Sequence, residues 1–334
     1  MKVERDRAVE VAKTALETFE INPSDAHRTA EMLVTVDAMG KHSHGLLRLP
    51  RFIRGIANNN VNPDVTIDII SEKDSVVALD GGARLGPVVA NTATEEAITR
   101  AEAHGVGVVG VRNSNHLGML GYYTNQIRST GFVGIAMTNT EPAMPPYGGA
   151  EPVLGTNPLA IGLPTDPPFN LDMSTSAIAR GTVLHLHETD QELPEGVALN
   201  AAGEPTTDPE AALNGTILPF DAVKGSGLAI AIEVLAGGLV GAAMGEEVTG
   251  TYHTENPCTK DDLFIALDPG VVSRQDFVEA ASLFLQRLKN TETAAEFETI
   301  RLPGERSIER DSTVDTVSID DDLWEEIQGL IKDD

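Results

Sequence analysis

The chain has 334 residues, of which 51 are acidic and 24 basic, so its formal net charge is −27. Such a surface repels phosphate backbones and anionic headgroups, which argues against nucleic acid or a membrane as a partner. Because 41% of the residues are apolar and hydrophobic segments recur along the chain, we expect two or three packed subdomains and not a disordered protein.

Only eight of the basic residues are lysine. An acidic, lysine-poor surface predicts a protein that works at high salt, where screening shortens the range of self-repulsion; an ordinary acidic protein is the alternative. The single cysteine, Cys258, rules out an internal disulfide. The first residues lack a signal-peptide core, and the apolar run 227–244 contains Glu233 and several glycines. We therefore expect a cytoplasmic protein in which this run is a closely packed buried helix.

Apolar periodicity predicts the elements in chain order. Helices are expected over 5–19, from Ser24 as N-cap to about Met39, and over 46–57. Strands over 65–70 and 75–79 precede a helix over 87–104, a strand over 106–111, a helix over 120–129 and a strand over 133–138. The loop 141–157 is rich in proline and glycine, and a loop of this length is usually functional.

The second half is expected to begin with strands over 159–163 and 169–173, and a helix from about Ser176 follows them. Residues 191–216 are polar and form an excursion. A buried helix over 225–244, a strand over 263–267, a helix over 274–288 and a short helix around Trp324 complete the chain.

Two histidines lie where regular structure ends in a loop. His44 follows Ser43 and precedes Gly45, and His116 lies in the segment Asn-Ser-Asn-His-Leu-Gly over 113–118. Histidine is the side chain best matched to proton transfer near neutral pH. Either segment alone is more often an ordinary polar loop, but together they are candidates for catalysis.

The glycines over 105–110 match the dinucleotide pattern GxGxxG, but their context is wrong for it. That fingerprint needs a strand before it, a helix after it and an acidic residue about 20 positions on. Here the predicted helix comes first, and the next acidic residue is Glu141. We interpret these glycines as part of a buried strand with tight neighbours.

Other polar segments fit an anionic ligand. Lys224 directly precedes a glycine-led helix, where backbone N–H groups and a lysine together favour an anion; a lysine that only caps a loop is the alternative. The turn 172–176 holds more polar residues than N-capping needs. No histidine has company at metal-ligand spacing, and no GxSxG elbow indicates a hydrolase.

Taken in order, these segments resemble the type-2 malate/L-lactate dehydrogenase family, which also includes sulfolactate, ureidoglycolate and diketogulonate oxidoreductases and a cyclic-imine reductase. The matching stretches span roughly residues 37 to 306: DAMGKHSHGLLRLPRF, NSNHLGMLGYYT, TNTEPAMPPYGGAEPVLGTNPLAIGLP, LDMSTSAIARG, PFDAVKGSGLAIAIEVLAGGL and LPGER.

The resemblance implies an α/β fold in which a nicotinamide cofactor, NAD or NADP, binds a non-Rossmann domain with a largely antiparallel sheet. It implies that residues 1–75 are the helical part of a substrate and dimerisation domain, that residues 76–250 bind the cofactor, and that residues 251–334 return to the first domain. It also implies a homodimer with the active site near the subunit interface.

Site residues carry over by position. The resemblance implies that Ser43, His44 and His116 are catalytic and that Arg48 contacts the substrate carboxylate. The lack of metal-ligand spacing predicts that no metal ion takes part. The stretches that match cofactor-contacting segments contain Thr156, Asn157, Asp172, Ser174, Thr175, Ser176, Lys224, Gly304, Glu305 and Arg306.

The chain departs from the family pattern in three places. Pro-Phe-Asp-Ala-Val-Lys-Gly replaces the usual PFGGYKG, Thr182 stands where lysine is common, and the segment 197–203 lacks two acidic residues. The last change puts in doubt any catalytic relay that ends in a carboxylate there.

We expect hydride transfer between NAD(P)H and C2 of a small 2-oxo or 2-hydroxy acid, malate- or lactate-like, with a histidine moving the proton. An imine or sugar-acid reductase on the same scaffold is one alternative. A catalytically silent nucleotide-binding dimer is the other, and the presence of both histidines, Arg48 and Lys224 argues against it.

Overall fold

The computed structural model describes residues 1–251, 255–273 and 276–331. Its centre is a seven-stranded sheet in the order β2-β3-β4-β10-β5-β6-β7. These strands are β2 (Asp68–Lys73), β3 (Val76–Asp80), β4 (Val106–Arg112), β10 (Asp262–Leu267), β5 (Val133–Thr138), β6 (Leu159–Leu163) and β7 (Phe169–Met173). Among these strands β3 and β4 pair in parallel, and the other neighbours pair antiparallel. The expectation of a largely antiparallel sheet is confirmed.

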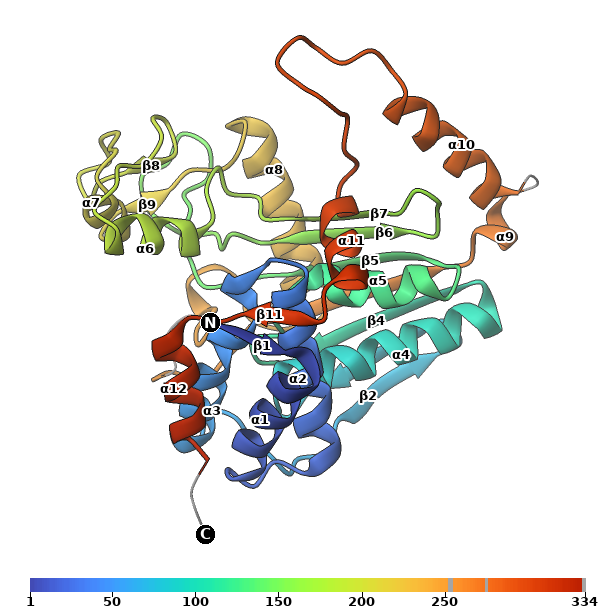
Figure 1. Ribbon diagram of the computed structural model, residues 1–334, viewed down its shortest axis with the longest axis horizontal. Coiled ribbons are helices and arrows are strands. Elements are labelled where there is room, and N and C mark those ends of the chain that lie inside the picture. The colour runs from blue at the N-terminus through green and yellow to red at the C-terminus, as the bar shows by residue number, and fades with distance from the viewer. Residues whose placement is uncertain (252–254, 274–275, 332–334) are drawn as a thin grey trace.

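Helices cover both faces of this sheet. On one face, α4 (Gly86–His104) and α5 (Leu120–Ser129) pack on a core that includes Val109, Tyr123 and Phe264 (Figure 1). On the other face, α8 (Val223–Ile232) and the π-helical segment Glu233–Gly238 contribute Ile232 and Ala236 to a smaller core with Met137 and Leu263. The alternation of side chains along the strands supplies both cores.

The glycines over 105–110 lie in β4 and the turn before it, as predicted. Gly105, at φ +83°, ends α4 in the left-handed conformation that favours glycine. A Cβ at Gly107 would lie 2.0 Å from the carbonyl oxygen of Ala97 in α4. These glycines therefore end a helix and let it approach the sheet, and they do not form a phosphate-binding turn.

The two ends of the chain meet in a helical region. It contains α1 (Arg5–Glu17), α2 (Pro23–Ala38), α3 (Leu49–Ala57) and α12 (Asp321–Gly329). The strands β1 (Lys2–Glu4) and β11 (Thr316–Ser318) pair antiparallel. Leu33, Phe52 and Trp324 share its core, so the implied helical part that joins N- and C-terminal segments is confirmed. The side chain that accepts the N-terminal hydrogen bond of α2 is Asn22 and not Ser24.

The excursion over 191–216 forms a small lobe with the helix before it (Figure 1). The lobe contains α6 (Arg180–Glu188), β8 (Ala198–Leu199), α7 (Pro209–Leu213) and β9 (Thr216–Ile217). The predicted helix start at Ser176 is wrong, because Ser176 forms a β-bridge with Pro219 and the helix begins at Arg180.

The last elements are α9 (Pro269–Val272), α10 (Phe277–Lys289) and α11 (Glu305–Thr313). The predicted start of α10 at Arg274 lies outside the described residues. Leu285 is the buried residue of α10, and this helix and the connection after it stand away from the rest of the molecule (Figure 1). No helix in the described part of the chain is long and apolar enough to cross a membrane.

The expectation of one buried helix over 225–244 is wrong for the single chain. The segment is α8 followed by the π-helical turn, and Ile230, Val234 and Leu239 are 45%, 53% and 66% exposed. Apolar composition indicates that a segment avoids water, but it does not say which surface covers it.

Candidate active site

The two histidines predicted from the sequence face each other. His44 lies in a 3₁₀ turn, His42–His44, directly after α2, and His116 lies in the loop between β4 and α5. Their rings are stacked, with centroids 6.1 Å apart and planes at 29°. Phe52 of α3 contacts His116, with a centroid distance of 6.2 Å. The fold thus brings both predicted segments into one site.

Close backbone approaches hold the His116 loop in place. The side chain of Asn115 donates hydrogen bonds to the carbonyl oxygens of Ala83 (2.8 Å) and Arg84 (3.0 Å). A Cβ at Gly86 would lie 2.3 Å from the carbonyl oxygen of His116. The loop therefore lies against the start of α4, and bulkier residues at this contact would displace it.

Hydrogen bonds indicate the protonation state of His116. The backbone N–H of Gly118 donates to Nδ1 of His116 at 3.2 Å, so the neutral ring carries its proton on Nε2. Burial lowers the pKa of His116 well below its usual value, and the charge of Arg48 lowers it further. His116 is therefore neutral at pH 7.

His44 is also held in the neutral form. Its Nδ1 lies 2.9 Å from the hydroxyl oxygen of Ser43. Burial lowers the pKa of His44 to about 4, with further contributions from the charges of Arg48 and Lys41. A neutral imidazole can accept a proton from a substrate hydroxyl, which is what a general base must do.

Two arginines lie one helical turn apart next to the histidines. Nε of Arg48 donates to the backbone oxygen of Ser43 at 2.7 Å. Nη2 of Arg51, which is 8% exposed, donates to the backbone oxygen of Gly250 at 2.8 Å. Both positive charges lower the pKa of His116. This potential favours an anionic substrate.

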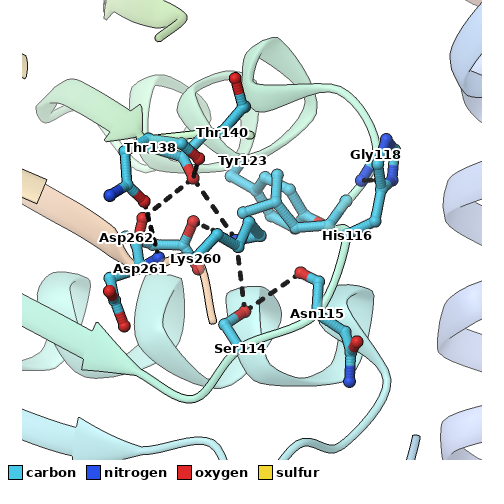
Figure 2. Close-up of polar contacts among 12 residues, drawn as sticks. Ser114, Asn115, His116, Gly118, Tyr123, Thr138, Thr140, Lys260, Asp261 and Asp262 are labelled. Carbon is cyan, nitrogen blue, oxygen red and sulfur yellow. Dashed lines mark hydrogen bonds and ion pairs between the residues drawn. The ribbon is translucent and has the colours of Figure 1, made fainter. Parts of the chain in front are cut away.

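The sequence reasoning missed a buried charged cluster beside this site. Figure 2 shows Lys260 between Ser114 and Thr138. Nζ of Lys260 lies 2.5 Å from Oδ1 of Asp262, 3.5 Å from the Ser114 hydroxyl and 3.4 Å from the Thr138 hydroxyl. Lys260 is only 2% exposed, and its charge also lowers the pKa of His116. The available signal was the run of three charged residues directly before a predicted buried strand.

Asp261, the middle residue of that run, is 1% exposed. Burial raises its pKa to about 8; the charge of Asp262 raises it further, and the charge of Lys260 opposes both. The side chain is therefore protonated over most of the neutral range.

Several predicted cofactor residues converge around one turn. The backbone N–H and the hydroxyl of Thr175 both donate to the carbonyl oxygen of Thr156, each at 2.8 Å. The hydroxyl groups of Ser174 and Ser176 are 2.8 Å apart. Asn157 is fully buried. The strand-to-helix turn and the end of the long loop thus form one surface with hydroxyl and backbone groups.

Asn157 is held by a second buried acid that the sequence reasoning did not assign to the site. Glu233 opens the π-helical segment and is 5% exposed. Its carboxylate accepts hydrogen bonds from Nδ2 of Asn157 (2.6 Å), Nδ2 of Asn139 (3.2 Å) and the backbone N–H of Gly245 (2.9 Å). π-Helical turns of this kind are frequent at functional sites.

The other predicted cofactor residues lie around this surface. Asp172 accepts the backbone N–H of Gly121 at 2.8 Å, and burial raises its pKa to about 6. Lys224 has a side chain that is 79% exposed and an ion pair of 2.7 Å with Asp221. An ammonium group in this position can exchange its carboxylate partner for a phosphate.

The stretch 304–306 starts α11 beside β7. Gly304 has φ +78°, and a Cβ there would lie 2.4 Å from the carbonyl oxygen of Asn170. Glu305 pairs with Lys289, and its Oε2 accepts the backbone N–H of Leu302 at 3.1 Å. Arg306 is exposed. Gly304 thus allows the chain to pass close to β7, and Glu305 fixes the backbone just before α11.

Two cavities lie next to the two histidine segments. One, of about 650 Å³, is lined by His42, Asp37, Leu47 and the chain ends around Met1 and Ile319. The other, of about 20 Å³, lies between Arg51, Asn115 and His116. The described residues contain no group of three histidine, cysteine or acidic side chains that could hold a metal ion.

Comparisons with known proteins identify the family of the chain. The family model for malate/L-lactate dehydrogenase matches residues 3–328. The chain is 42% identical over 320 residues to an L-sulfolactate dehydrogenase from Methanocaldococcus jannaschii, covering 94% of this chain and 92% of that protein. It is 35% identical over 317 residues to a malate dehydrogenase from Pyrococcus horikoshii, covering 92% and 87%.

Comparison with solved structures points to the same family. The solved structure of the sulfolactate dehydrogenase from Methanocaldococcus jannaschii matches with a TM-score of 0.93 and 40% identity, over 99% of this chain and 96% of that chain. The family model and the relatives, which are named as hydroxy acid dehydrogenases, make this chain a hydroxy acid oxidoreductase. The chain belongs to the malate/L-lactate dehydrogenase family.

Proposed function

We propose that this chain is an NAD(P)-dependent dehydrogenase for 2-hydroxy acids in which His44 and His116 handle the proton and Arg48 binds the substrate carboxylate. When bound, the cofactor supplies or accepts the hydride at C2. The observation that carries the proposal is the stacked pair of neutral histidines beside Arg48.

In the direction of oxidation, neutral His44 accepts the proton of the substrate hydroxyl while Ser43 orients its ring through the Nδ1 contact. His116, which offers Nε2–H, donates a hydrogen bond to the same oxygen. A carboxylate on Arg48 offsets part of the positive charge next to His44 and so raises its pKa. In the reverse direction His44 then returns the proton to the forming alkoxide.

The substrate that fits best carries a second anionic group, as malate and sulfolactate do. Arg48 and Arg51 both place positive charge around His116, which is more than one carboxylate needs. The relatives named for malate and sulfolactate support this choice.

The residues that would hold the cofactor fit a nucleotide. Thr156, Asn157 and the turn with Asp172, Ser174, Thr175 and Ser176 offer hydroxyl and backbone groups, and Lys224 offers an exposed ammonium. Gly304, Glu305 and Arg306 lie next to the strand that leads into this turn. We assign these residues to NAD or NADP binding.

A homodimer is part of the proposal. Large apolar side chains of α8, the π-helical segment and α10 are exposed, and grouped exposed apolar residues are typical of interaction surfaces. They are Ile230, Val234, Leu235, Leu239, Val278, Leu283, Phe284 and Leu288. A second copy of the chain would cover them. Sedimentation at low micromolar concentration should therefore give twice the mass of 35.4 kDa, and a monomer would contradict this part.

The proposed folding units are residues 1–75, 76–250 and 251–334. The central sheet joins all three, because β2 belongs to the first and β10 to the last. We also propose a cytoplasmic location, since a chain whose single cysteine is free and buried does not depend on an oxidising compartment for disulfides.

The test of function is turnover with a substrate panel. Absorbance of NADH and NADPH is followed with oxaloacetate, sulfopyruvate, pyruvate and a cyclic imine acid, in molar KCl. We expect the two dianionic substrates to have the highest kcat/KM. A preference for pyruvate would refute the proposal that the substrate carries two anionic groups. A preference for the cyclic imine acid would favour the alternative reductase, and no turnover with any of the four would favour a catalytically silent dimer.

A further inference from the structure

One buried carboxylate spans the turn that carries His44. Asp37 lies in the last turn of α2 and is 6% exposed. Its Oδ1 lies 2.8 Å from Nδ1 of His42, and its Oδ2 accepts the backbone N–H of Leu46 at 2.8 Å. The two partners lie on either side of His44, so a single side chain holds both ends of the turn.

Gly45 makes this arrangement possible. A Cβ at Gly45 would lie 2.3 Å from Cγ and 2.5 Å from Oδ2 of Asp37, closer than any side chain can come. The carboxylate therefore lies against the backbone of the residue that directly follows His44. The turn has no room to move toward α2.

Other hydrogen bonds also hold the turn. The backbone N–H of His44 donates to the carbonyl oxygen of Lys41 at 2.9 Å, and that of Gly45 to His42 at 3.2 Å. These two bonds are internal to the turn, Arg48 bonds the carbonyl oxygen of Ser43, and the backbone N–H of Lys41 donates to Val36 of α2 at 3.0 Å. Asp37 differs from these contacts because one side chain of α2 bonds the chain both before and after His44.

We propose that Asp37 is a positioning residue that holds His44 in its catalytic orientation by bonding His42 and the Leu46 N–H at once. The proposal rests on the proposed role of His44. A displacement of about 1 Å at a catalytic group can cost about 10²-fold in rate, so this contact is large enough to matter.

The main test uses His42, which is 55% exposed at its side chain, so that its variants will fold. In His42→Asn the amide nitrogen replaces the Nδ1–H donor at nearly the same place, whereas His42→Gln carries its amide farther out and His42→Ala has none. We expect near-normal kcat for His42→Asn. For the other two variants we expect kcat to fall by about three- to tenfold, since one of the two hydrogen bonds of Asp37 is lost. Cofactor affinity should not change in any of them.

Asp37 itself is tested with two variants and one control. Asp37→Ala should lower kcat by about 10- to 100-fold, and Asp37→Asn, which keeps an acceptor for Leu46, should lower it less. Asp311→Asn is the control: Asp311 pairs with Arg5 at 2.9 Å, and Arg5 also reaches Thr35 of α2, away from the turn. It should keep normal kcat.

Hydrogen exchange of the Leu46 amide gives a readout separate from activity. It should be faster in Asp37→Ala and unchanged in Asp311→Asn. Equal kcat in all three His42 variants, or normal kcat in folded Asp37→Ala, would overturn the proposal. If His44→Ala were itself fully active, the proposed function would fail instead, and exchange at Leu46 would still report whether Asp37 holds the turn.

Discussion

Replacing Arg48 separates its charge from its shape. The pKa of His44 falls from 6.5 to about 4, which corresponds to about 3 kcal/mol against the charged ring. Burial is the largest cause and Arg48 the second, so Arg48 accounts for less than half of the shift. Arg48→Met should therefore raise the pKa of His44 but leave it below the usual value of 6.5.

Arg48→Lys keeps the charge but loses the planar fork. We expect the pKa of His44 to stay near that of the parent protein, whereas kcat/KM for a carboxylate substrate should fall by about 30- to 150-fold, the equivalent of 2–3 kcal/mol for a charge-assisted contact. Arg54→Met is the matched control in the helix that follows Arg48, since the side chain of Arg54 is 61% exposed and pairs with Glu326. It should change neither quantity.

The pKa is measured by NMR of the imidazole carbons in the free protein, where the signal of His44 is assigned by its loss in His44→Gln. The acid limb of kcat/KM for malate oxidation provides the second measurement, because the neutral ring is the active form and activity is lost as pH falls through the pKa. An unchanged or lower pKa in Arg48→Met would refute the electrostatic reasoning. Unchanged kinetics in Arg48→Lys would refute the carboxylate contact.

Four further outcomes are expected. His44→Ala and His116→Ala should each lower kcat by about 10²- to 10⁴-fold at unchanged cofactor affinity; stopped-flow and nucleotide titration separate the two effects. Lys224→Ala should weaken cofactor binding by about tenfold, whereas Asp221→Asn should not, and equal dissociation constants would contradict this. Because the pKa of Asp261 is raised to about 8, the folded chain keeps a proton that the unfolded chain releases above pH about 4, and stability falls as pH rises through this window. Melts of Asp261→Asn should thus match the parent protein near pH 4 and exceed it above pH 8; lower stability at both would count against it. Finally, with a net charge of −27 the melting temperature should keep rising to molar KCl, and a flat curve above about 0.15 M, where the Debye length is already about 8 Å, would disprove salt adaptation.

Local pattern was sufficient for much of the fold. The strands β5, β6 and β7 begin and end where the sequence predicts, because β-branched and apolar runs bounded by turn residues have few alternatives. The rejection of the dinucleotide fingerprint also rested on local order, since a helix before the glycines and a strand through them can be read from periodicity. The candidate histidines were identified from loop position and residue type alone.

Long-range packing decided the rest. The stacking of His44 on His116 joins segments 72 positions apart, and the bond from Lys260 to Ser114 spans 146. Periodicity describes which face of an element is apolar, but it carries no information on what that face meets. For the same reason the sequence predicted a buried helix over 225–244, although one side of this segment is exposed. It also predicted that α6 starts at Ser176, because the bridge between Ser176 and Pro219 depends on long-range packing.

The sequence by itself thus determined the strands β5, β6 and β7, the family and the candidate site residues, because these depend on residue type and neighbouring positions. The tertiary structure alone decided the protonation state of the two histidines and the contacts that hold the His44 turn. Both histidines are neutral because of burial and nearby charge. Asp37 bonds both ends of the turn because α2 ends next to it. Burial and charge at a site are sums over segments that meet only when the chain is folded.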